Sequence, residues 1–282
     1  MRQSGVALIQ IMVIAAIISI VAFDFVAGAK HQLRLTSLIS DKNKALLQLS
    51  SDKAQLLYDL KTYGIENAYS SNSYNFFGLP KKYGEYSVIT IQDNAGLLHL
   101  HYPDEEILLN TLIYSGIEME RATSILNSLL DWQDLDIETR GGSLDDKDSV
   151  RNGAIPHLSE LSKLPNLNNK EKLLLESILT PYTKSQFNPL TAPNELLRGY
   201  VKNVNYEEIK TIRNERALTE SEFLSLAGIY PDFGIIFLPS NILTISIRTQ
   251  INQSIAEEEF VVEFLNNDSD GQQPFNYLST KF

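Results

Sequence analysis

The sequence predicts an α+β fold in which a long N-terminal helix packs on a small antiparallel sheet that is interrupted by a large all-helical insertion. Helical periodicity without proline extends through residues 6–63, and runs rich in β-branched residues occur near residue 90 and again after residue 240. Short helical patterns fill the roughly 135 residues between these runs. Because an isolated two-stranded hairpin is marginal in water, we expect the early and late strands to share one sheet.

An apolar run at residues 6–23 is broken only by Gln10 and Ser19, and no charged residue lies between Arg2 and Asp24. About 18 helical residues at about 1.5 Å each, lengthened by residues 25–29, are enough to cross a hydrocarbon core of about 30 Å. The sequence therefore predicts a membrane-spanning segment at residues 6–29.

The leader at residues 1–5 permits two interpretations. A secretory signal would place its cleavage site after the apolar run, whereas here only Met-Arg-Gln-Ser-Gly precedes the run. The leader resembles the prepilin type, in which a dedicated peptidase cuts after Gly5, leaves Val6 as the new terminus and retains the apolar helix. The alternative is an uncleaved single-pass anchor with Arg2 on the cytoplasmic side.

Leucine and isoleucine residues recur at spacings of three, four and seven beyond the membrane segment, which predicts one helical stripe lying on a soluble domain. One helix over residues 6–63 would be about 80 Å long. Two helices with a hinge near Gly28 fit the sequence almost as well. The stripe consists of Leu35, Leu38, Ile39, Leu46, Leu49, Leu56, Leu57 and Leu60.

Strands are predicted on both sides of the helical insertion. Residues 86–91 and 97–102 flank turn residues at 93–96 and are expected to form a hairpin, after an irregular connection at residues 63–84. Residues 242–251 and 259–265 are the late strands. The expected organisation is a leader at 1–5, a membrane segment at 6–29, a helix half with the first strands at 30–102, the helical insertion at 103–238, and the last strands with a C-terminal tail at 239–282.

The insertion contains a weak internal repeat. Residues 103–109 and 192–198 share an acidic helix start followed by an apolar pair, and each leads after a turn into a second amphipathic helix. Two helix-turn-helix units, or a chance similarity of capped amphipathic helices, would produce this pattern. Helices are expected at 107–113, 122–132, 158–164, 170–179, 195–201, 206–213 and 221–226.

Composition restricts the function classes. The hydrophobic content of 43% and charged content of 21% are typical of a folded protein. A net charge of -11, together with acidic or Asn-rich turns, argues against binding to nucleic acid, because such binding depends on basic residues that neutralise phosphates. The chain has no cysteine, which excludes disulfides and thiolate ligands.

An acidic cluster after the single tryptophan, Trp132, is the strongest candidate for a metal site. Carboxylates at alternate positions with nearby glycines suit calcium, which takes six to eight oxygen ligands. The match to an EF-hand loop is poor, since Thr139 occupies the sixth position, and a solvated acidic loop is the alternative interpretation. Trp132 itself is expected to lie in the core. The candidate ligands are Asp134, Asp136, Glu138, Asp145 and Asp146.

The sequence contains no familiar catalytic motif. His99 and His101 lie two residues apart on a predicted strand, but no other His or Cys nearby completes a zinc site, and we interpret both as exposed sheet residues. A Walker loop, a G-x-S-x-G elbow and a dinucleotide-binding fingerprint are missing. The rival hypothesis to a non-enzymatic role is a single-pass membrane-anchored periplasmic enzyme that uses the acidic cluster as its metal site.

Several motifs in a fixed order resemble the K family of minor pseudopilins, the general secretion pathway protein K family of type II secretion systems. The similar features are the start at residues 5–9, the inserted helical region, the string Leu-Asp-Trp-Gln-Asp-Leu-Asp at 130–136, the string Asn-Pro-Leu-Thr-Ala at 188–192, and residues 221–224 before the last strands. The resemblance extends over nearly the whole chain.

This resemblance implies a pilin-type N-terminal helix, an α/β pilin domain and an insertion with two SAM-like helical units. It implies a non-enzymatic subunit at the tip of a short periplasmic pseudopilus, held in the inner membrane by one span. Implied partners are minor pseudopilins I and J, the major pseudopilin, the prepilin peptidase and the inner-membrane assembly platform. Gly5 would be the cleavage point, Val6 the methylated terminus and Gln10 the fifth mature residue, where most pilins carry Glu and K-type subunits do not. Calcium in the inserted region is also implied.

Overall fold

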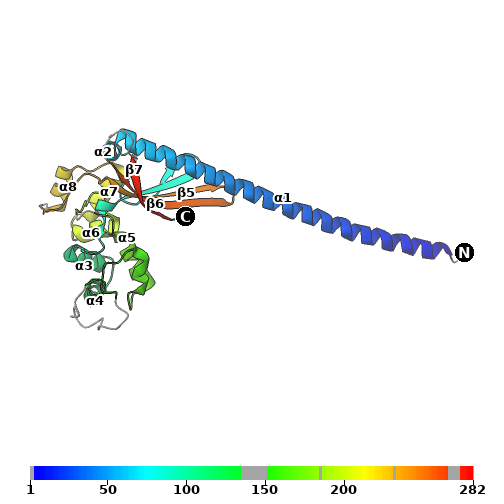
Figure 1. The fold of residues 1–282 in the computed structure, drawn as a ribbon, viewed down its shortest axis with the longest axis horizontal. Helices are drawn as coiled ribbons and strands as arrows, with labels where there is room; N and C mark the ends of the chain where they lie inside the picture. The colour runs from blue at the N-terminus through cyan, green and yellow to red at the C-terminus, as the bar shows by residue number, and fades with distance from the viewer. Residues whose placement is uncertain (1–2, 135–150, 184–185, 231–232, 266–273, 282) are drawn as a thin grey trace.

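The computed structural model describes residues 3–134, 151–183, 186–230, 233–265 and 274–281. One long helix leads into an antiparallel sheet, and a group of shorter helices lies at the end of the molecule that is farthest from the N-terminus (Figure 1). The fold class is therefore α+β, which confirms the class predicted from the sequence.

Helix α1 (Gln3–Tyr63) is continuous over 61 residues, which corresponds to about 90 Å. The alternative with a hinge near Gly28 is wrong, because the helix passes through this exposed glycine without a break. Gly64 follows the helix with φ of +83°, a conformation that L-residues rarely adopt. This glycine turns the chain into the short helix α2 (Ile65–Ser70).

The sheet has five strands in the order β1-β2-β5-β6-β7, and every neighbouring pair is antiparallel. Pairing of β2 with β5 confirms that the early and late strands share one sheet; Ile89, for example, lies opposite Ile247. A two-residue turn with Asn252 at φ of +52° connects β5 to β6. The strands are β1 (Lys81–Tyr83), β2 (Ser87–Asp93), β5 (Ile242–Ile251), β6 (Ser254–Phe264) and β7 (Phe275–Lys281).

The core lies between one face of the sheet and the second half of α1. Alternate residues of β2, β5 and β6 are buried, and α1 contacts β5 and β6. Burying a leucine or isoleucine side chain contributes about 1.5–3 kcal/mol, so this face is what attaches the helix to the sheet. Members of the buried hydrophobic cluster include Leu49, Leu56, Leu57 and Leu60 of α1 and Ile89, Ile91, Leu243, Ile245, Ile247, Phe260 and Val262 of the sheet.

The predicted hairpin over residues 86–102 is wrong. The turn residues form the 3₁₀ helix η1 (Asn94–Gly96), after which β3 (Leu98–His99) pairs in parallel with β4 (Leu179–Thr180) instead of returning along β2. A Cβ atom at Gly96 would lie 2.3 Å from the carbonyl oxygen of Thr191, so the chain is packed closely against a distant loop here. Tertiary packing therefore overrides the local turn signal.

Three further elements differ from the prediction. Residues 63–84, expected to be irregular, contain α2 and the short edge strand β1. The opposite edge strand, β7, lies in the part of the chain expected to be a tail. Its residues are mostly exposed and lack apolar alternation, which removes the signal that identifies a strand from sequence.

Short helices form the region between β3 and β5, close to the predicted positions, although residues 158–163 adopt a 3₁₀ helix. The elements are α3 (Glu105–Tyr114), α4 (Met119–Asp131), η2 (Leu158–Lys163), α5 (Asn169–Ile178), α6 (Asn194–Tyr200), α7 (Tyr206–Glu215) and α8 (Glu220–Ala227). We refer to this group of helices as the helical head. The domain limits at residues 103 and 238 stay a prediction.

Both copies of the predicted internal repeat are pairs of helices joined by a turn. The first helices of the two copies, α3 and α6, pack directly against each other. A Cβ atom at Gly199 would lie 2.2 Å from Thr111 Oγ1 and 2.7 Å from Thr111 Cα, so the backbones approach as closely as glycine permits. The repeated helices are therefore partners in one core.

Candidate membrane anchor and assembly site

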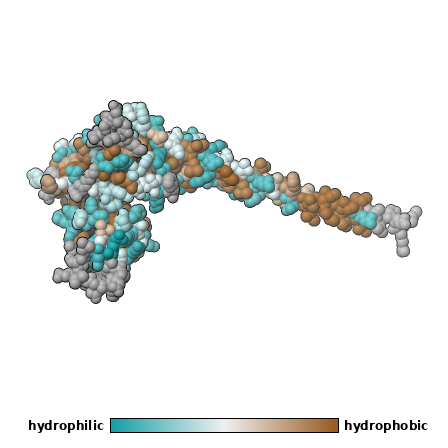
Figure 2. Space-filling model, in the orientation of Figure 1, coloured by the Kyte–Doolittle hydropathy of each residue, from teal (hydrophilic) through white to brown (hydrophobic). Residues whose placement is uncertain are grey.

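The first half of α1 extends away from the rest of the protein and carries an exposed apolar surface, visible as a brown block near the N-terminal end of the helix in Figure 2. The side chains of residues 8–37 are all exposed. In water such a surface would be unfavourable by about 25 cal/mol per Å², so it requires lipid or a protein partner. Within the described residues, one helix is long and apolar enough to cross a membrane.

The predicted processing residues lie at the start of this helix. Gly5 and Val6 belong to the first turns of α1, and the Gln10 side chain is exposed among apolar neighbours. A neutral amide at position 10 places no charge in the apolar segment, whereas a carboxylate there would be costly in lipid. The first acidic side chain of the helix is Asp24, which follows the longest apolar run.

Polar contacts attach the second half of α1 to the hairpin between β5 and β6. Lys42 Nζ donates to the carbonyl oxygen of Ile255 at 2.5 Å, and Asn252 Nδ2 donates to Asp41 Oδ2 at 3.0 Å. One helical turn earlier, the carbonyl oxygen of Leu38 accepts a hydrogen bond from the Ser254 hydroxyl at 3.3 Å. Residues 8–37 are all exposed, so α1 extends away from the sheet up to Leu38 and is attached to the sheet from Leu38 onwards.

Lys53 of α1 forms an ion pair with Glu258 of the sheet. Its Nζ lies 2.5 Å from Glu258 Oε1 on β6, and the two side chains are only 19% and 8% exposed. The same ammonium lies 4.3 Å from the ring centre of Phe260 and 4.6 Å from that of Tyr277. The aromatic rings complete a cage around the cation.

We expect Lys53→Met to lower the free energy of unfolding by about 2 kcal/mol, between the values for exposed and fully buried ion pairs, because Glu258 is left buried without its partner. The double variant Lys53→Met with Glu258→Leu should recover most of this loss. Urea denaturation of the full chain in detergent micelles measures both values. Equal destabilisation by the single and double variants would show that the loss of stability does not come from leaving Glu258 without Lys53.

The predicted leucine stripe divides into a buried part and an exposed part. Leu49, Leu56, Leu57 and Leu60 are buried against the sheet, but Leu35, Ile39 and Leu46 are exposed, which corrects the expectation that the whole stripe packs on the domain. Leu35 and Ile39 precede Asp41, where α1 meets the β5–β6 turn. Leu46 follows Asp41 but is also exposed, between the buried residues Ala45 and Leu49. The three exposed residues, which we call the exposed flank of α1, continue the apolar surface of the membrane segment.

The acidic cluster falls mostly outside the described residues, where Asp136, Glu138, Asp145 and Asp146 lie. Asp134 is described and follows helix α4. Over the described ranges, no group of three or more His, Cys, Asp or Glu side chains is placed to hold a metal ion. The calcium site therefore stays a prediction.

Side chains on both sides of this acidic segment are held together. Trp132 is buried, as predicted, and its Nε1 donates to Glu160 Oε1 at 3.3 Å. Arg151 Nη1 contacts both carboxylate oxygens of the same Glu160 at 2.8 Å. Trp132 and Arg151, which flank the acidic segment, are therefore held close together by their shared contact with Glu160.

His99 is the last residue of β3, and His101 lies in the turn that follows it. Both side chains are half-buried, so their interpretation as exposed sheet residues is wrong. His99 Nδ1 accepts hydrogen bonds from the backbone N–H groups of His101 at 3.0 Å and Tyr102 at 3.2 Å. Burial lowers the pKa of His99, and the neighbouring His101 lowers it further. His101 Nε2 contacts the carbonyl oxygen of Ile155 at 2.7 Å, so both rings serve the structure of the turn.

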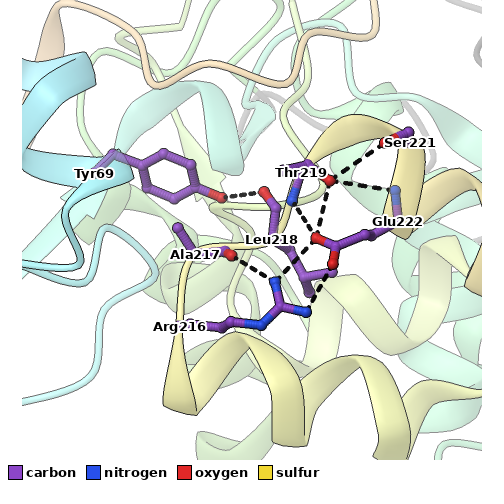
Figure 3. Close-up of polar contacts among 7 residues, drawn as sticks. All are labelled: Tyr69, Arg216, Ala217, Leu218, Thr219, Ser221 and Glu222. Atoms are coloured by element: carbon purple, nitrogen blue, oxygen red, sulfur yellow. Dashed lines mark hydrogen bonds and ion pairs between the residues drawn. The ribbon is translucent and has the colours of Figure 1, made fainter.

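The end of α2 contacts the connection between α7 and α8 (Figure 3). Tyr69 Oη donates to the carbonyl oxygen of Leu218 at 3.3 Å, and burial raises the pKa of Tyr69 to about 12. Beside this contact, Arg216 forms a two-pronged pair with Glu222, with nitrogen–oxygen distances of 2.7 and 3.0 Å. Glu222 also accepts hydrogen bonds from the backbone and hydroxyl of Thr219, which completes a capping box on α8.

The Arg216 guanidinium and the Thr219 donors hold the pKa of Glu222 at about 2. Because this value lies below the ordinary value of 4.5, the ionised group stabilises the fold above about pH 4.5 and this contribution disappears as the pH falls towards 2. We expect Arg216→Gln to raise the midpoint of a carbon-13 titration of the Glu222 carboxyl, whereas Arg198→Gln should leave it unchanged. An unchanged midpoint in Arg216→Gln would contradict this assignment.

These features define the class of this protein: an α+β protein with one candidate membrane-spanning helix, half exposed and half packed on an antiparallel sheet that carries a helical head. No protein-family model matches the sequence, and no curated protein sequence matches it either. A chain from the crystal structure of the GspK-GspI-GspJ complex of the type 2 secretion system of enterotoxigenic Escherichia coli has a similar structure. The TM-score is 0.52 at 14% sequence identity, and the match covers 87% of this chain and 98% of that chain. At this identity the likeness establishes the fold.

Proposed function

We propose that this chain is a K-type minor pseudopilin that initiates or caps the pseudopilus of a type II secretion system and so supports protein export across the outer membrane. The observation that carries the proposal is the likeness to a chain of the GspK-GspI-GspJ complex over nearly the full length of both chains. The K-family motifs in the sequence point to the same function independently. The role is assembly, without catalysis.

The exposed apolar half of α1 is the inner-membrane anchor, and the sheet and helical head lie in the periplasm. Prepilin peptidase removes residues 1–5, after which Val6 is N-methylated and the helix stays in the mature protein. Two observations support this: the apolar surface starts within a few residues of Gly5, and the helix continues without a break into the folded part.

A position at the tip fits two features of the chain. Gln10 supplies no carboxylate to neutralise the terminal ammonium of a subunit ahead, and a subunit with nothing ahead needs none. The helical head lies at the end of the molecule opposite the N-terminus (Figure 1), where its bulk would obstruct a further subunit.

The partners are minor pseudopilins I and J, then the major pseudopilin below them and the inner-membrane assembly platform; nucleic acid is not a partner. The exposed flank of α1, formed by Leu35, Ile39 and Leu46, supplies an apolar surface for the helices of these partners. Asp134, Asp136, Glu138, Asp145 and Asp146 are the candidate calcium ligands, and their carboxylates suit a hard cation.

Affinity capture of the full chain with its cognate I and J subunits in detergent tests the proposal. We expect a stable complex of all three chains. Ile39→Asp should reduce capture at least tenfold by placing a charge on the exposed flank, whereas Ser51→Asp, on another side of the same helix, should not. Failure of the unaltered chain to associate, under conditions in which I and J bind each other, would overturn the proposal.

A further inference from the structure

The last residue of β2, Asp93, is completely buried and connects three separate segments of the chain. Its Oδ1 accepts hydrogen bonds from Ala95 N at 3.0 Å and from Ser240 Oγ at 2.6 Å and Ser240 N at 3.2 Å. Its Oδ2 accepts from Thr191 Oγ1 at 2.8 Å. Ser240 lies two residues before β5, and Thr191 lies three residues before α6. One carboxylate therefore holds the connection into the head, the connection out of it and a loop within it.

The adjacent Asn94 also forms hydrogen bonds to two separate segments. Its Nδ2 donates to Thr244 Oγ1 of β5 at 3.0 Å, and its Oδ1 accepts from Thr180 Oγ1 of β4 at 2.6 Å. The backbone N–H of Asn188 donates to the carbonyl oxygen of Ala95 at 2.7 Å. The consecutive side chains of Asp93 and Asn94 thus connect the five-stranded sheet to β4 and to a loop of the head by hydrogen bonds.

A buried arginine of α7, Arg213, contacts the same junction between the sheet and the helical head, which we call the seam. Arg213 is 2% exposed, and its guanidinium donates to the carbonyl oxygen of Ala192 and to Asn194 Oδ1, both at 2.6 Å. The guanidinium also lies 4.1 Å from the ring centre of Phe77, which bridges to β2. Burial lowers the pKa of Arg213 to about 10 and raises that of Asp93, because removal from water disfavours the charged form of each group.

Displacement of Asp93 or Arg213 would leave buried donors and acceptors without partners, which costs free energy. We propose that Asp93 and Arg213 act as a latch that fixes the direction of the helical head relative to α1 and the sheet. The head is then a rigid extension of the sheet and does not swing about its two connections. This inference does not depend on the proposed role in secretion, since it concerns the geometry of the isolated chain.

Distance measurements between spin labels test the latch directly. The chain has no cysteine, so Lys44→Cys on α1 and Thr123→Cys on α4 provide the only two thiols. Double electron–electron resonance on the full chain in detergent should give one narrow distance distribution. Adding Thr191→Val and Ser240→Ala, which keep Asp93 but remove both of its hydroxyl donors, should at least double the width. Thr211→Val, which removes only a bond within α7, is the matched control and should leave the width unchanged.

Circular dichroism and the melting temperature distinguish an effect on the direction of the helical head from an effect on the stability of the fold. A latch predicts a broader distribution while the helical signal is retained; Asp93→Ala should broaden it further. A lower melting temperature with an unchanged distribution in the Thr191→Val, Ser240→Ala variant would overturn the proposal, because the groups would then only stabilise the seam. A broad distribution in the unaltered chain would overturn it as well.

Discussion

A chain that lacks residues 1–29 is expected to fold but to leave export at the level of a null strain. Buried side chains of α1 begin at Asp41, and residues 8–37 are exposed throughout, so the folded part does not depend on the deleted segment. The deleted segment contains the apolar part of the candidate membrane span. Secretion by a null strain that carries the truncated chain, together with circular dichroism of the purified chain, measures both outcomes.

The matched control replaces residues 6–29 with an unrelated apolar helix of the same length. If the segment only anchors the protein, this replacement should restore export; if it also packs against other subunits, export should stay low while the chain remains in the membrane. Full export by the truncated chain would contradict a role for the helix in assembly.

Gly199→Ala should lower the free energy of unfolding by about 3 kcal/mol, at the upper end of the range for overpacked sites. The new Cβ would meet backbone atoms of Thr111 at 2.7 Å, and a backbone cannot move aside as the end of a flexible side chain can. Helices α3 and α6 would therefore have to separate. Urea denaturation monitored by circular dichroism measures the effect.

Gly153→Ala is the control, because a Cβ atom there would meet nothing within 4 Å and the position has no positive φ. It should change the free energy of unfolding by less than about 1 kcal/mol. An equally small effect of Gly199→Ala would contradict the close packing of α3 against α6.

Features governed by local periodicity could be predicted from the sequence. The apolar run, the absence of proline and the spacing of the leucines specify α1, and β-branched runs specify β2 and β5. The part of the leucine stripe that remains exposed could not be predicted, because periodicity identifies a face but not the length of the surface that covers it. The position of the β5–β6 turn decides this for Leu35 and Ile39, and the width of the covered face decides it for Leu46.

The errors arise where distant segments decide the conformation. Residues 93–96 carry good hairpin-turn chemistry, yet Thr191 and Ser240 arrive from elsewhere in the chain and engage Asp93. One signal was present: Ser87, Ile89, Ile91 and Asp93 alternate along β2, so Asp93 follows the buried residues inward. A carboxylate at an inward strand position requires donors, and these could have been expected even though their identity could not.

Mass spectrometry of the mature N-terminus, on protein isolated from its own membrane, tests the central claim most directly. A pseudopilin retains its apolar helix after processing, and so the N-terminal peptide should begin at an N-methylated Val6. An intact Met1, or a terminus beyond residue 29, would contradict the account.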